Sequence, residues 1–82
     1  MPLLIVTGDC RSCRDAERVW RAACAAMGVV LECVDAESTR GAALVAEHAL
    51  KSLPVLILDG KVAVAGVPST DLACRILNGG TS

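Results

Sequence analysis

Residues 3–13 read LLIVTGDCRSC, where a short apolar run, Leu3–Val6, is followed by a turn and then by Cys10 and Cys13. A continuous apolar run of this length is typical of a strand buried on both faces of a sheet. Over residues 12–27, apolar side chains recur at spacings of three and four, which predicts an amphipathic helix. The two cysteines are therefore expected where a buried strand passes into a helix.

The rest of the chain alternates further strands and helices. The predicted elements are a strand over residues 29–34, a weaker helix over residues 41–51, a hairpin of Val55–Leu58 and Lys61–Ala65 around Asp59-Gly60, and a last helix after the N-cap residue Ser69 with Leu72, Ala73, Ile76 and Leu77 on its buried face. Because a helix joins the first two strands, these are expected to be parallel. The order β-α-β-α-β-β-α predicts an α/β fold in which three helices flank a four-stranded mixed sheet.

Composition narrows the class of protein. The 82 residues predict a single domain over residues 1–82, with 54% hydrophobic residues, one aromatic residue, Trp20, and a formal net charge of −1. Such a chain has neither the basic face nor the stacking aromatics that nucleic-acid binding requires. No apolar run approaches the roughly 18 residues of a membrane span, and the start of the chain lacks the basic region of a signal peptide. A cytoplasmic monomer without nucleic-acid or membrane partners is expected.

The position of Cys10 and Cys13 predicts thiol chemistry. The unpaired backbone N–H groups at the start of a helix stabilise a nearby thiolate. Cys10 precedes the helix and should be the more exposed sulfur, whereas Cys13 lies in the first turn, close enough to form a disulfide with it. We expect the Cys10 thiolate to attack a substrate disulfide and Cys13 to release the product, without a bound cofactor.

Two other classes of function remain open on the residues alone. Cys10 and Cys13 could form half of a metal site, but a structural zinc site needs a second pair of ligands and the chain has no second C-x-x-C motif. The alternative is a non-enzymatic binder of a metal or metalloid that uses Cys10, Cys13 and a third thiol. A redox-inert interaction module on the same scaffold is a further alternative.

Several stretches together resemble the thioredoxin superfamily, and most of all its small glutaredoxin-like proteins of bacteria and archaea. The resemblance covers residues 3–77 and rests on Cys10-Arg11-Ser12-Cys13, on Ser52-Leu53-Pro54-Val55, on the hairpin Leu58-Asp59-Gly60-Lys61 and on Gly66-Val67-Pro68-Ser69. It implies a thioredoxin-like fold and a thiol–disulfide oxidoreductase that acts on protein or small-thiol disulfides. It also implies a cis peptide bond before Pro54, a substrate-binding role for Leu53 and Pro54, and a reductase or dithiol as electron donor.

The chain departs from the resemblance at three places. Asp9 stands where thioredoxins carry a tryptophan, and Leu3–Val6 lacks the buried acidic residue of their first strand. Glutaredoxins have a double glycine where this chain has Gly66 followed by Val67. The resemblance therefore leaves open whether glutathione binds and which group deprotonates Cys13.

Two of the remaining three cysteines are expected to be structural. Cys24 follows Cys13 by eleven residues on one helix face, about 16 Å away, which is too far for a disulfide. Cys24 and Cys33 are predicted to be packed thiols. Cys74 is predicted to point away from the buried face of the last helix, as a partly exposed thiol.

Overall fold

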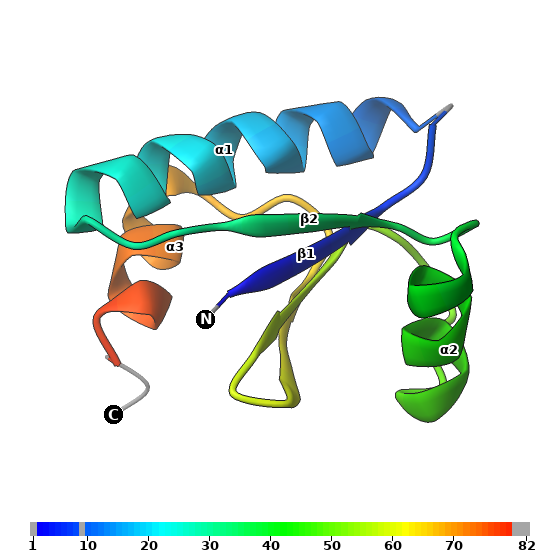
Figure 1. Cartoon of the computed structure of the whole chain (residues 1–82). Helices are drawn as coiled ribbons and strands as arrows, with labels where there is room; N and C mark the ends of the chain where they lie inside the picture. The colour runs from blue at the N-terminus through cyan, green and yellow to red at the C-terminus, as the bar shows by residue number, and fades with distance from the viewer. Residues whose placement is uncertain (1, 9, 80–82) are drawn as a thin grey trace.

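The structure is a computed structural model that describes residues 2–8 and 10–79; Asp9 lies outside the described residues. Its elements are β1 (Leu3–Val6), α1 (Arg11–Met27), β2 (Glu32–Asp35), α2 (Thr39–Glu47), β3 (Val55–Leu58), β4 (Lys61–Ala65) and α3 (Thr70–Leu77) (Figure 1). The strands form one sheet in the order β2-β1-β3-β4. Strand β1 is parallel to β2 and antiparallel to β3, which is antiparallel to β4. The predicted element order, mixed sheet and three helices are confirmed.

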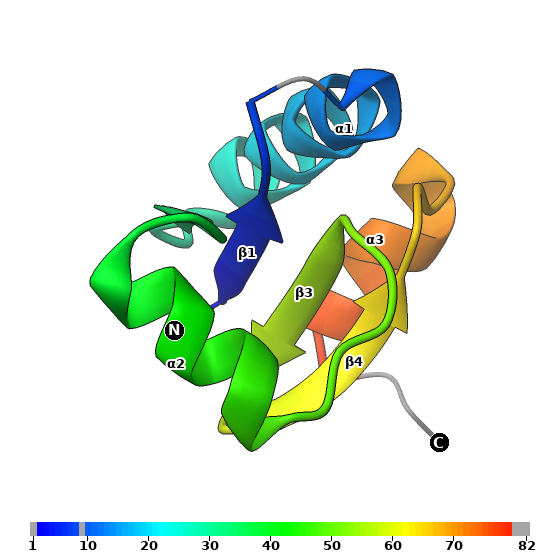
Figure 2. The same cartoon turned by 90° about the vertical axis from the view of Figure 1, so that its right-hand side faces the viewer.

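Two apolar layers hold the sheet between the helices. Helices α1 and α3 lie on one face, and α2 lies on the other (Figures 1 and 2). The first layer is built from Leu4, Ala16, Trp20, Ala23, Leu56 and Ala73, and the second from Ile5, Val55 and Ile57 packed against apolar residues of α2 and the segment after it. Neighbouring strand residues point to opposite faces, so the apolar runs of β1 and β3 serve both layers.

Helix α1 begins directly after Cys10, one residue earlier than predicted, and ends at Gly28. Gly28 has a φ of +68°, a left-handed conformation that glycine adopts without a side-chain penalty. The turn continues as the Val29 N–H donates to the Cys24 carbonyl oxygen at 2.8 Å. Within the part of the chain that the structure describes, no helix combines the length and apolar character needed to cross a membrane.

Two predicted boundaries were wrong. The second strand is Glu32–Asp35 rather than residues 29–34, because the chain first completes the turn after α1 and then pairs with β1, from Leu3 opposite Glu32 onwards. Helix α2 spans Thr39–Glu47 rather than residues 41–51. It begins early because the Ser38 Oγ accepts the Gly41 N–H at 2.9 Å, and it ends early because Ala49 has a positive φ.

Of the four residues predicted for the buried face of α3, Ala73 is buried and Ile76 and Leu77 pack against the first layer, as expected, whereas Leu72 was predicted incorrectly. Ser69 is the N-cap as expected, with its Oγ accepting the Leu72 N–H at 3.1 Å. However, the Leu72 side chain is 39% exposed, whereas Cys74 is half-buried and packs against the layer that contains Trp20. Helix α3 lies against α1 as well as the sheet, and this second neighbour turns Cys74 inward and Leu72 outward.

Candidate functional site

Cys10 and Cys13 lie at the N-terminus of α1, where the sequence predicted them. Cys10 is the N-cap residue, with an extended backbone, and its Sγ accepts the backbone N–H of Cys13 at 3.0 Å. The Cys10 carbonyl oxygen accepts the Arg14 N–H at 3.3 Å. The Cys10 sulfur therefore accepts a hydrogen bond from one of the backbone N–H groups that have no partner within the first helical turn.

The two sulfurs differ in their exposure to solvent. Cys10 is half-buried and Cys13 is only 2% exposed. Burial raises the pKa of the Cys13 thiol above its ordinary value, and the neighbouring Cys10 raises it further, while a hydrogen bond to the Thr7 backbone opposes them. The site thus combines the accessible sulfur of Cys10 with the buried sulfur of Cys13, whose environment favours the protonated thiol.

The segment before β3 forms the next part of the site. The Leu53–Pro54 peptide bond is cis, as the resemblance implies. The Pro54 carbonyl oxygen accepts the Gly66 N–H at 2.8 Å, which ties this segment to the loop before α3. Pro54 is buried and Leu53 is half-buried. The Leu53 backbone N–H and carbonyl form no backbone hydrogen bond with the described residues.

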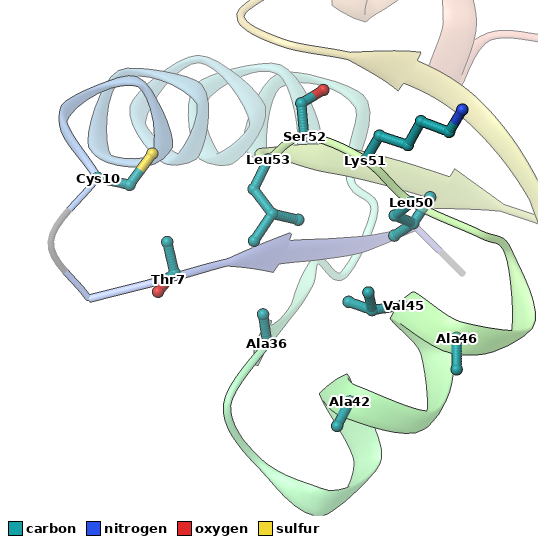
Figure 3. A pocket seen from close by; sticks show the side chains of 10 residues that line it. All are labelled: Thr7, Cys10, Ala36, Ala42, Val45, Ala46, Leu50, Lys51, Ser52 and Leu53. Atoms are coloured by element: carbon teal, nitrogen blue, oxygen red, sulfur yellow. The ribbon is translucent and has the colours of Figure 1, made fainter.

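An open groove of about 580 Å³ connects Cys10 with Leu53. Its lining residues come from the end of β1, from the turn before α2, from α2 itself and from the segment before Pro54; they are Thr7, Cys10, Ala36, Ala42, Val45, Ala46, Leu50, Lys51, Ser52 and Leu53. Figure 3 shows Cys10 at one side of this groove and Lys51 at the other, with Leu53 between them. Sequence analysis found Cys10 and Leu53 but missed the wall that α2 supplies.

A smaller hollow of about 220 Å³ adjoins Cys13. Its lining includes the acidic residues Glu17 and Asp35, which sequence analysis did not place near the cysteines. Glu17 forms the ion pair with Arg21 at 2.6 Å that their i,i+4 spacing favours. The Asp35 Oδ1 accepts the Glu37 N–H at 2.8 Å. Among residues 2–8 and 10–79, no three His, Cys, Asp or Glu side chains are grouped as metal ligands.

The other cysteines lie away from this groove. Cys24 is 2% exposed, which confirms a packed thiol. Cys33 is half-buried, and its sulfur accepts a hydrogen bond from the Arg21 guanidinium at 3.6 Å. Burial raises the pKa of both thiols.

Comparisons with known proteins agree with the fold. The family model described as a thioredoxin domain matches residues 1–78. Eighteen chains of solved structures match. Among them is the glutaredoxin-like protein NrdH-redoxin from Escherichia coli, which is 21% identical over 92% of each chain, with a TM-score of 0.64. No curated protein matches the sequence. Because the family model covers nearly the whole chain, the protein belongs to the thioredoxin superfamily of redox proteins.

Proposed function

We propose that this chain is a thiol–disulfide oxidoreductase in which Cys10 attacks the substrate and Cys13 resolves the intermediate. The supporting observation is the 3.0 Å hydrogen bond from the Cys13 N–H to the Cys10 sulfur at the start of α1. This donor and the helix dipole stabilise negative charge on the outer sulfur. The structural relative NrdH-redoxin is a glutaredoxin-like protein described as having a thioredoxin-like activity profile, and we propose a similar profile here.

In the first step, the Cys10 thiolate attacks one sulfur of the substrate disulfide. A bond forms between the Cys10 sulfur and that sulfur, while the substrate S–S bond breaks. The leaving substrate thiolate takes a proton from solvent. The groove that reaches Cys10 gives the substrate access to this sulfur, whereas the burial of Cys13 denies it access to the inner one.

In the second step, Cys13 loses its proton to solvent and attacks the Cys10 sulfur. The Cys10–Cys13 disulfide forms, and the second substrate thiolate is released. The substrate has gained two electrons and the cysteine pair has lost two. A dithiol or a thiol reductase returns the pair to the reduced form, and the reverse sequence oxidises a substrate dithiol.

Leu53 and Pro54 are proposed to hold the substrate segment. A proline has no N–H to donate, and the Pro54 carbonyl is already bonded to Gly66. Leu53 lines the same groove as Cys10, and its backbone groups, which form no backbone hydrogen bond with the described residues, can pair with an extended chain that carries the substrate cysteine. The substrates are disulfides of proteins or of small thiols.

Trapping of the intermediate tests this proposal. The reduced variants Cys13→Ser and Cys10→Ser are mixed with 2-hydroxyethyl disulfide, and the intact mass is measured. Cys13→Ser is expected to accumulate a mixed disulfide on Cys10, whereas Cys10→Ser is expected to form none. Cys74→Ser is the matched control, since it removes a thiol of α3 that does not line the groove, and it should turn over like the unaltered protein. Equal adducts on both active-pair variants would contradict the assigned roles.

A further inference from the structure

We propose that the groove selects disulfide-bearing peptides in which an apolar residue beside the cysteine is followed by an acidic residue. This inference rests on the proposed function and names its substrate class. In this arrangement, the substrate cysteine meets Cys10, the apolar side chain lies on the groove wall near Leu53, and the carboxylate meets Lys51.

The apolar part of the proposal follows from the lining. Alanine, valine and leucine side chains from α2 and from the flanking turns form most of the wall, and Thr7 and Ser52 add hydroxyl groups. Covering a surface of this kind with another apolar side chain removes apolar area from water, which favours binding. A volume of about 580 Å³ admits several residues of an extended peptide and exceeds what a small thiol would fill.

The acidic part follows from Lys51. Among the described residues, it is the only lysine, arginine, aspartate or glutamate that lines the groove, and its ammonium forms no ion pair with any of them. The side chain is exposed and extends from the rim on the side away from Cys10 (Figure 3). A substrate carboxylate would supply an opposite charge there, whereas a substrate lysine or arginine would be repelled.

The spacing follows from the order of the residues along the groove, since the backbone itself bends at Ser52 and Leu53. Figure 3 shows Leu53 between Cys10 and Lys51, so a substrate strand that crosses the groove from Cys10 passes Leu53 before it reaches Lys51. Residues two apart in an extended substrate strand point to the same face of that strand. Its acidic residue is therefore expected two positions beyond the residue that lies on Leu53.

The test compares three peptide disulfides that differ in one side chain. Each is a symmetric disulfide of a short peptide with a cysteine, an adjacent leucine, and glutamate, glutamine or lysine two positions beyond that leucine. The pre-reduced protein is mixed rapidly with each peptide at low salt, and the second-order rate constant is measured. The glutamate peptide is expected to react about 3- to 10-fold faster than the lysine peptide, with the difference shrinking in about 0.5 M salt.

Two pairs of variants locate the effect. Lys51→Glu is expected to reverse the order of the glutamate and lysine peptides. Lys61→Glu makes the same change in net charge on the exposed β4 hairpin and is expected to keep the order. On α2, Ala46→Glu places a carboxylate in the groove and is expected to slow the glutamate peptide, whereas Ala43→Glu, exposed on the same helix but outside the lining, is not.

Two outcomes overturn the inference. One is equal rate constants for all three peptides, and the other is an equal effect of Lys51→Glu and Lys61→Glu on their order. Reduction of 2-hydroxyethyl disulfide by the unaltered protein separates this failure from that of the proposed function. If that small disulfide is not reduced, the proposed function fails; if it is reduced while the peptides react alike, only the selection by the groove is lost.

Discussion

The backbone N–H of Cys13 donates to the sulfur of Cys10 across the first turn of α1, at 3.0 Å. The same hydrogen bond caps α1 and holds the Cys10 sulfur close to the backbone of Cys13. The contact that starts the helix therefore also sets the geometry of the cysteine pair. Serine, threonine, aspartate and asparagine are the usual N-cap residues, and here a sulfur takes that place.

The cap makes a prediction about stability. Cys10→Ala removes the acceptor and is expected to destabilise the reduced protein by about 0.5–1 kcal/mol, at the low end for a cap because sulfur is a weak acceptor. Cys10→Ser supplies a stronger acceptor and is expected to leave the stability unchanged or to raise it. Urea unfolding of the reduced proteins measures both. Equal midpoints for the alanine and serine variants would show that the contact contributes nothing to the helix.

The difference in burial predicts a difference in reactivity. When reduced protein is treated with substoichiometric iodoacetamide at pH 7, alkylation is expected at Cys10 before Cys13, because only the thiolate reacts and Cys13 is covered. A raised pKa means that Cys13 holds its proton to higher pH than an ordinary thiol, whose value is 9.0. Its labelling should therefore rise only as the pH passes above 9. Peptide mass spectrometry locates the label, and preferential labelling of Cys13 near pH 7 would contradict this assignment.

The sequence alone predicted the boundaries of those strands that begin and end at neighbouring turn residues. The strands Leu3–Val6, Val55–Leu58 and Lys61–Ala65 begin and end where apolar runs meet turn residues, and the structure confirms all three. The second strand differs, because Val29 and Val30 have strand-like side chains but pair with no strand among the described residues, and pairing with β1 begins only at Glu32. Strand limits that depend on a neighbouring strand cannot be obtained from periodicity alone.

The site was predictable to a similar degree. A conspicuous spacing marks Cys10 and Cys13, and the Leu53-Pro54 pair stands out in the sequence. The groove is different, since it unites the end of β1 with α2 and with residues 50–53, and this only becomes visible once the sheet brings them together. The only hint of the groove in the sequence of α2 was the pair Ala42 and Ala46, whose small side chains lie four residues apart and leave space beside the helix. The periodicity of residues 70–77 likewise could not anticipate that α3 packs against α1.

The ion pair between Glu32 and Arg40 predicts a pH dependence of stability. The two side chains join β2 to α2 through two contacts, one of them at 3.2 Å. The hydrogen bond and charge of Arg40 lower the pKa of Glu32 below its ordinary value of 4.5. A lowered carboxyl pKa contributes stability that is present above 4.5 and is lost as the pH falls through the lower folded-state value. The stability difference between the unaltered protein and Glu32→Gln, measured by urea unfolding, should thus shrink between about pH 5 and pH 2 and also in high salt. A constant difference would mean that the pair does not act in solution.

Gly41 fixes how closely α2 approaches the turn before it. In the first turn of α2, a Cβ at this position would overlap the Asp35 carbonyl oxygen and lie 2.9 Å from the Ala36 Cα, both of them backbone atoms that cannot rotate away. Alanine is a better helix former than glycine by about 1 kcal/mol, so helix propensity alone predicts that Gly41→Ala stabilises the protein. The overlap predicts the opposite, a loss of about 1–3 kcal/mol, typical of forced backbone shifts.

The same substitution should affect the groove. If α2 must move away from Asp35, its residues Ala42, Val45 and Ala46 leave their positions in the wall, while the first turn of α1 stays in place. Gly41→Ala is therefore expected to slow the reduction of the leucine-containing peptide disulfides more than that of 2-hydroxyethyl disulfide. Ala43→Gly is the matched control on the same helix, and it should lose about 1 kcal/mol of stability through propensity alone, with both substrates affected equally. A stabilised Gly41→Ala variant, or one that slows both substrates alike, would show that the close approach of α2 does not shape the groove.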